Sequence, residues 1–237
     1  MTEFGSVTTL LPYRDRRAAG QVLADQLRRY AGRPGLEIVA LPQGGVPVGF
    51  HVARSLRAPL DVLVVHKLLL PGDSGLAMGA LASGGVCVLD GEVLRENALD
   101  SDAMKRVVAD ELPALERRET RLRGHRPPLD VRGRPVILVD DGVATGATLR
   151  VAIAGLRAQS PASITVAVPV GAQETLDRLA SEVDEVVCPR MPEPFYAVGL
   201  SYDRFPELAD TDVRALLDAA QQENPFVARD EEDEDEV

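Results

Sequence analysis

Two adjacent carboxylates and a run of small and hydroxyl residues stand together in the segment VILVDDGVATGATL, residues 136–149. The apolar run Val136–Val139 is typical of a buried strand, which places Asp140 and Asp141 directly at its end. The Gly/Thr-rich turn that follows leads into a helix, where backbone N–H groups and threonine hydroxyls can bind a phosphate. Ionised carboxylates only accept hydrogen bonds, and they suit the paired hydroxyls of a ribose or a hydrated Mg²⁺. The segment therefore indicates a site for a 5-phosphoribosyl group.

Two other interpretations of this segment are weaker. An ordinary helix start with two solvated acids accounts for the threonines and glycines, but not for two carboxylates at the mouth of a buried strand. A dinucleotide site or a Walker loop is not indicated, because neither Gly-x-Gly-x-x-Gly nor Gly-Lys-Ser/Thr is present.

The same segment resembles the phosphoribosyl pyrophosphate signature of the type I phosphoribosyltransferases, two acids followed by a Thr-Gly-x-Thr turn. The resemblance implies that Asp140 and Asp141 are the catalytic acids that hold the ribose. It also implies that the phosphate of the phosphoribosyl group binds at Val143, Ala144, Thr145, Gly146, Ala147 and Thr148. The implied ligands are phosphoribosyl pyrophosphate with Mg²⁺ and a nucleobase, and the implied reaction displaces pyrophosphate from C1 of the sugar by a ring nitrogen of the base.

A second motif, LPQGG at residues 41–45, resembles the loop with which this family binds pyrophosphate through backbone amides. The family usually has Lys or Arg before the two glycines, and here that residue is Gln43, followed by Gly44 and Gly45. A plain strand-to-helix turn is the alternative. Lys67, after the next apolar run, is the fourth residue expected to contact pyrophosphate.

A third stretch, FYAVGLSYD at residues 195–203, resembles the base-binding hood of purine phosphoribosyltransferases. The resemblance implies that Tyr196 or Phe195 stacks on the base and that Asp203 helps to hold the metal. An aromatic pair that only caps the core is the alternative. The 6-oxopurine enzymes have an aspartate where this chain has Ala144, whereas adenine, uracil and orotate enzymes tolerate alanine there, so the nucleobase stays unassigned.

These motifs need a frame of alternating strands and helices to position them. Apolar runs predict strands, each followed by a helix, and the N-terminal half also contains a hairpin between two helices. Pro113 is expected to kink or divide the charged helix 101–123. The predicted elements are helix 15–30, strand 36–41, a helix to Leu56, strand 60–65, hairpin 68–89, helix 101–123, strand 136–139, helix 147–158, strand 164–168, helix 172–180, strand 183–187 and a last helix around 213–220.

This order predicts an α/β fold: a doubly wound, mainly parallel sheet with a small hood, whose ligands bind beyond the carboxyl ends of the strands. We expect one domain over residues 1–222, with the hood formed by 68–125 and 189–206, and a disordered acidic tail over 223–237. The resemblance also allows a homodimer.

Composition excludes several classes of protein. The chain has 237 residues and a net charge of −11, but seven consecutive acids occupy 230–236, and without them 30 acidic residues face 26 basic ones. A body so nearly balanced has no field to attract nucleic acid. Two cysteines and three histidines are too few for a disulfide framework or a Cys/His zinc site. With no long apolar run and no signal-peptide pattern, we expect a cytoplasmic protein away from membranes.

Two functions remain open at this stage. The first is a phosphoribosyltransferase of the nucleotide-salvage type, and the second is a non-catalytic sensor of phosphoribosyl pyrophosphate or a nucleotide that regulates a partner. Gln43 in place of a basic residue, and Gly75 where related proteins place Glu, favour the sensor.

Overall fold

The computed structural model describes residues 11–70, 73–89, 91–97 and 101–224. Its main sheet has five parallel strands in the order β2-β1-β6-β7-β8. Their bounds are β1 Glu37–Ala40, β2 Leu60–Val62, β6 Pro135–Val139, β7 Ser163–Ala167 and β8 Glu185–Val187. The central strands are mainly apolar because helices cover both faces of the sheet.

Alternate residues of the central strands divide the core into two layers. Ile38 and Ile137 pack with α1 (Arg16–Gln26), α2 (Gly45–Leu56) and α7 (Asp210–Glu223) on one face. Val39 and Leu138 pack with α5 (Ala147–Ala158) and α6 (Gln173–Ala180) on the other. The doubly wound, mainly parallel α/β fold expected from the sequence is confirmed.

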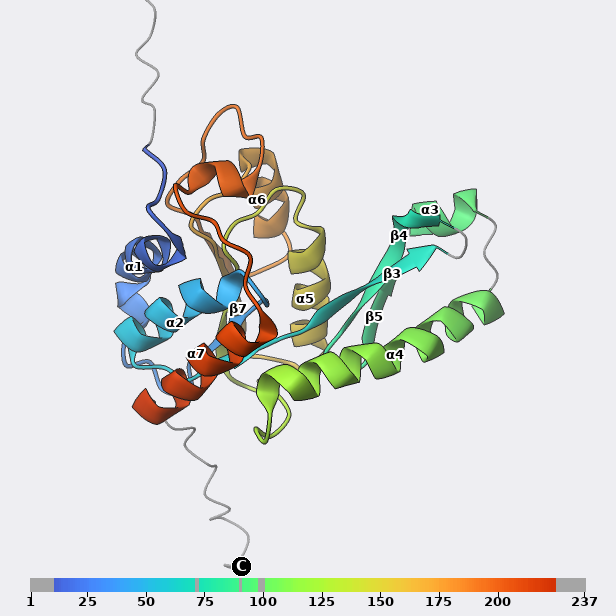
Figure 1. The fold of residues 1–237 in the computed structure, drawn as a ribbon, viewed down its shortest axis with the longest axis horizontal. Coiled ribbons are helices and arrows are strands. Elements are labelled where there is room, and N and C mark those ends of the chain that lie inside the picture. Colours follow the sequence, from blue (N-terminus) through green and yellow to red (C-terminus); the bar gives the residue numbers. More distant parts are fainter. Residues whose placement is uncertain (1–10, 71–72, 90, 98–100, 225–237) are drawn as a thin grey trace, which may run out of the picture.

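A second, antiparallel sheet of three strands extends away from the main sheet beside α5 (Figure 1). It consists of β3 (Val65–Leu70), β4 (Asp73–Ala82) and β5 (Val86–Leu89), and it is followed by α3 (Gly91–Glu96) and α4 (Ser101–Arg123). We call β3 to α4, without the undescribed positions between them, the arm. Two short 3₁₀ helices, η1 (Arg28–Tyr30) and η2 (Val198–Ser201), complete the described elements.

Three elements differ from the sequence-based expectation. The segment expected as a hairpin over 68–89 belongs to a sheet of three strands that begins at Val65. The strand expected over 60–65 is divided between the two sheets. After β2 the backbone of Val64 pairs with Ser83, which follows β4, instead of with β1: its N–H donates to Oγ of Ser83, and its carbonyl accepts the N–H of Ser83. Helix α4 is undivided at Pro113. Both Pro113 and Ala109, whose carbonyl loses its usual donor, are exposed, so water can replace the missing hydrogen bond.

The segments expected to form one hood lie in different places. In Figure 1 the arm extends on one side of α5, whereas the chain leading to and from η2 lies near α6 and α1. Glu223, the second-to-last described residue and the first of the expected tail, belongs to α7, and its carboxylate pairs with Arg54 at 3.2 Å. The acidic run lies outside the described residues. Within the described part, no helix is long and apolar enough to cross a membrane.

Candidate functional site

The two acids and the glycine loop meet at the carboxyl edge of the main sheet. Strand β1 lies beside β6, and the N–H of Leu41 still donates to the carbonyl of Val139 at 2.9 Å. The loop then passes so close to β6 that a Cβ on Gly44 would overlap the carboxylate of Asp141. A Cβ on Gly45 would lie 2.7 Å from the Val139 carbonyl oxygen. Glycine at both positions is therefore required for the two motifs to share one site.

Asp141 is held by a residue that the sequence analysis missed. Arg16, in the first turn of α1, donates from Nε to Oδ2 of Asp141 at 2.8 Å and from Nη1 to the carbonyl of Pro206 at 2.8 Å. Its guanidinium lies 3.8 Å from the centre of the Phe205 ring. Asp15 caps this helix by accepting from the N–H of Ala18, which sets where Arg16 emerges. No local pattern could reveal the pair, because 125 residues separate Arg16 from Asp141.

The two carboxylates have different surroundings. Burial, and then the nearby charge of Asp141, raise the pKa of Asp140 well above its usual range. Burial also raises the pKa of Asp141, while the hydrogen bond and charge of Arg16 oppose that shift. Tyr202 donates from its hydroxyl to the backbone carbonyl of Asp141 at 2.5 Å. The acidic pair is thus enclosed on the protein side, with one cation beside it.

The turn after the acids is held from behind by the loop that follows β7. The N–H of Val143 donates to the carbonyl of Val170 at 2.9 Å, and Thr175 donates from Oγ1 to the carbonyl of Ala144 at 2.6 Å. Gly146 has φ +78° and caps α5, a conformation that glycine adopts without strain. The first N–H groups of α5 have no carbonyl within the helix to bond, and together with exposed Thr145 they form a suitable anion site.

The side chain of Gln43 is occupied by a contact with α7. Its side-chain amide donates to Oδ1 of Asp210, the first residue of α7, at 2.9 Å. The peptide bond between Pro42 and Gln43 is cis. Lys67 is an exposed residue of β3, and the cavity that it lines also includes Ala147 and Thr148 but none of residues 43–45. Lys67 thus faces α5.

The aromatic segment reaches the site through backbone and packing contacts. A Cβ on Gly142 would lie 2.6 Å from Cγ1 of Val198, so the stretch around η2 rests directly on the turn after Asp141. Phe195 is half-buried against the cluster that contains Tyr13 and Tyr202, whereas Tyr196 is 78% exposed. Of the two aromatic candidates, only Tyr196 is available to a ligand without repacking.

Asp203 is exposed, and its backbone N–H donates to the carbonyl of Tyr13 at 2.8 Å. Among the residues that the structure describes, no three His, Cys, Asp or Glu side chains cluster closely enough to hold a metal ion. Mg²⁺ commonly keeps several waters and is bound through one or two carboxylates plus the phosphates of its substrate. Asp140 and Asp141 fit that mode, since their oxygens stand beside the anion-binding turn.

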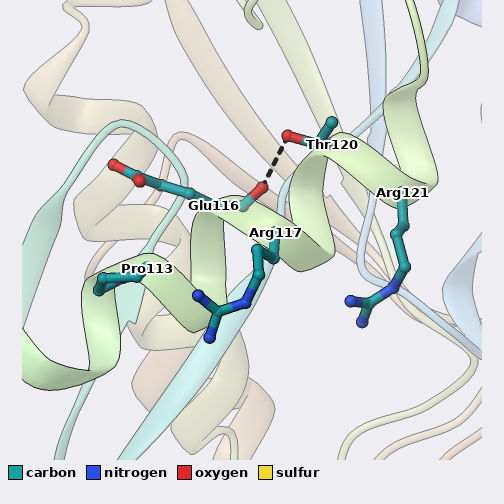
Figure 2. Close-up of a pocket in the computed structure, with 5 residues that line it drawn as sticks. All are labelled: Pro113, Glu116, Arg117, Thr120 and Arg121. Atoms are coloured by element: carbon teal, nitrogen blue, oxygen red, sulfur yellow. Dashed lines mark hydrogen bonds between the residues drawn. The ribbon is translucent and has the colours of Figure 1, made fainter.

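A hollow of about 460 Å³ lies away from these residues, on the surface of α4 (Figure 2). Figure 2 shows that its lining comes from that helix alone, with Arg117 and Arg121 pointing to the same side. One contact connects it to the site: Nε of Arg121 lies 3.4 Å from Oδ2 of Asp210, the residue that also holds Gln43.

Comparison with known proteins places the chain among phosphoribosyltransferases. A family model described as "Phosphoribosyl transferase domain" matches residues 6–203. Two Mycobacterium tuberculosis proteins, "Putative phosphoribosyl transferase MT0597" of strain CDC 1551 / Oshkosh and "Putative phosphoribosyl transferase Rv0571c" of strain ATCC 25618 / H37Rv, are each 44% identical over 206 residues. The match covers 87% of this chain and 46% of each relative, so the chain spans about half the length of these curated relatives.

A solved structure, that of TT1426 from Thermus thermophilus, is similar over most of both chains. Its sequence is 40% identical, and the superposition has a TM-score of 0.76, covering 87% of this chain and 98% of that chain.

Proposed function

This chain belongs to the phosphoribosyltransferase family, and from that premise we propose that it binds phosphoribosyl pyrophosphate with Mg²⁺ and transfers the phosphoribosyl group to or from a nucleobase. The observation that carries the proposal is the contact between Gly44 and the carboxylate of Asp141. It brings a loop of backbone amides, an acidic pair and an anion-binding turn to one edge of the sheet.

Each part has a distinct task in the proposal. Asp140 and Asp141 accept hydrogen bonds from the two ribose hydroxyls, and the turn from Val143 to Thr148 binds the phosphate at C5. The loop receives the pyrophosphate through the amide of Gly44, with Gln43 beside it, since the N–H of Gly45 donates to the carbonyl of Leu41 at 3.0 Å. Tyr196 offers an exposed ring on which a base can stack, and Asp203 completes the set as a metal-binding residue.

The chemistry needs no nucleophilic side chain. Breaking the bond at C1 develops positive charge on the ribose ring and negative charge on the departing pyrophosphate. Mg²⁺, when bound, would neutralise part of the pyrophosphate charge. The protein itself holds the sugar by Asp140 and Asp141, whose negative charge stabilises the positive charge that develops on the ring. It also orients the leaving group along the glycine loop.

The sensor stays a second candidate because of Gln43. Gln43 is uncharged, so the loop offers a pyrophosphate no cation at the position where the family usually has one. Its side-chain amide is also occupied by Asp210. Release of pyrophosphate from phosphoribosyl pyrophosphate in the presence of a panel of nucleobases separates the two functions. A transferase releases it with at least one base, and a sensor binds the sugar pyrophosphate without release.

The central assignment is tested by changing Asp140 and Asp141 to Asn together. We expect binding of phosphoribosyl pyrophosphate with Mg²⁺ to weaken by about 2–4 kcal/mol in calorimetry, because two charged acceptors for the ribose are lost. Inorganic phosphate at the turn should bind equally well or better, since two nearby negative charges are removed.

Asp177→Asn provides the matched control, because this exposed acid of α6 lies outside the site. Both ligands should bind the control as they bind the unchanged chain. If Mg²⁺-pyrophosphate without ribose loses as much affinity as the full substrate in the double variant, the acids hold metal instead of ribose and the assignment is wrong.

A further inference from the structure

A cavity of about 670 Å³ lies between the arm and α5. We call it the wedge. Strands β3, β4 and β5 form one wall, and the N-terminal half of α5 forms the other. Its lining is Val65, Lys67, Gly79, Ala80, Val88, Leu89, Gly91, Ala147, Thr148, Arg150, Val151, Ala154 and Glu182. The volume is within the range of small-molecule sites, roughly 300–1,000 Å³.

The shape follows from where the helix and the sheet touch. A Cβ on Gly155 would lie 2.9 Å from the Cβ of Ala82, so α5 and β4 are packed closely at that point. The α5 residues that line the wedge all come before it, nearer the N-terminus of the helix. Figure 1 shows the strands running away from α5 toward α3. The wedge is therefore closed beside Gly155 and widens toward the end of α5 that favours anions.

The lining has an apolar interior and one uncompensated cation. Val65, Val88 and Val151 provide apolar surface on both walls. Arg150 and Glu182 neutralise each other through a contact of 2.8 Å. Lys67 is exposed and has no ion-pair partner among the residues that the structure describes. The N-terminus of α5 adds partial positive charge to the same end.

From this arrangement we propose that the wedge binds a small molecule with an apolar body and one anionic group, such as an aromatic carboxylate or sulfonate. The apolar body lies between β4 and Val151, and the anion contacts Lys67. The wedge borders the site proposed for phosphoribosyl pyrophosphate, because Ala147 and Thr148 of the phosphate-binding turn also line it. It does not depend on Asp140 or Asp141, which are not part of its lining.

The probe is 8-anilinonaphthalene-1-sulfonate, an apolar anion whose fluorescence increases on leaving water. We expect saturable binding of one equivalent to the full chain. Lys67→Met should weaken it by about three- to tenfold, because the lost contact is a partly solvated ion pair. Ala154→Leu, which places a larger side chain in the wedge, should weaken it by about tenfold or more. Lys105→Met on α4 and exposed Ala158→Leu on α5 are the matched controls and should bind the probe as the unchanged chain does.

A second measurement locates the probe without a substitution. The chain has only two lysines, Lys67 and Lys105, so reductive methylation with carbon-13 formaldehyde gives two side-chain signals besides that of the terminal amine. The probe should shift the Lys67 signal and leave the Lys105 signal in place. The variant with Asn at positions 140 and 141 should keep full affinity, because neither side chain lines the wedge.

Three results would overturn the proposal. The first is unchanged probe affinity in both Lys67→Met and Ala154→Leu. The second is an equal shift of both lysine signals. The third is a shift of the Lys67 signal with rising protein concentration and no probe, accompanied by dimer formation in sedimentation, because a second copy would then cover the wedge.

Discussion

Asp140 is an acid in a position where burial and a neighbouring acid make its ionisation unfavourable. It is half-buried, its Oδ1 accepts the N–H of Asp141 at 2.9 Å, and the charge that affects its pKa most is that of another acid, Asp141. An isolated domain would be more stable with a neutral group there. Such a conflict between local stability and residue choice is typical of functional sites, where the ligand supplies the missing partners.

The unfavourable ionisation of Asp140 in the folded state predicts how its replacement changes the pH dependence of stability. The folded pKa is raised above the unfolded value of about 3.9, so the folded state holds the proton more tightly, and stability falls as pH rises between those values. Asp140→Asn removes this dependence but keeps the hydrogen bond from Asp141. We expect it to raise the free energy of unfolding near pH 8, and by much less near pH 4, in urea titrations. An equal gain at both pH values would show that the carboxylate is not destabilised in the folded state.

Three elements meet at Asp210, at the start of α7. Its carboxylate accepts from Gln43 of the loop before α2 and lies 3.4 Å from Arg121 of α4. The glycine loop is thus connected to two helices that are far from it in sequence. A change at position 43 therefore acts through Asp210 as well as on a ligand.

This connection predicts the result of restoring the family's usual cation. In Gln43→Arg the new guanidinium would pair with Asp210 and turn away from the ligand, so pyrophosphate affinity should change by less than about threefold. Adding Asp210→Asn releases the guanidinium, and we expect the double variant to bind pyrophosphate about tenfold more tightly in calorimetry. Asp210→Asn alone is the control. Full tightening in the single variant would mean that Asp210 does not hold the side chain at position 43.

At the scale of the whole molecule, one buried ion pair fastens the end of the arm to the main sheet. Nη1 of Arg123, the last residue of α4, lies 2.6 Å from Oδ1 of Asp61 in β2, and both side chains are almost fully buried. The same nitrogen donates to the carbonyl of Val62 at 3.3 Å, and Nη2 donates to the carbonyl of Pro127. The pair therefore orients α4, and with it one side of the arm.

Breaking this pair should destabilise the fold strongly. Arg123→Met leaves the carboxylate of Asp61 buried without its cation, and we expect a loss of about 3–5 kcal/mol in the free energy of unfolding. Asp61→Asn combined with Arg123→Met should recover part of that loss, since the uncompensated charge is gone. Arg117→Met, on an exposed side of α4, should cost little. A small effect of Arg123→Met would show that the arm is held mainly by apolar packing.

The sequence alone was sufficient for the parts of the molecule that are determined locally. Strand β6, the turn after Asp141 and helix α5 follow from an apolar run, a Gly/Thr turn and a helical period within one short segment, so their order and bounds could be predicted. The parallel sheet followed from the repetition of such units. The role of each residue in the site remains a prediction.

Only the tertiary structure decided which distant residues meet. Arg16 reaches Asp141 across 125 residues, and Gln43 reaches Asp210. The wedge exists because α5 touches β4 at Gly155 and separates from it toward the N-terminus of the helix. The division of the strand expected over 60–65 and the intact helix at Pro113 have the same origin, since pairing with Ser83 and access of water at Ala109 are set by the surroundings. Periodicity encodes which face of an element is buried, but the partner that covers it is chosen by packing of the whole chain.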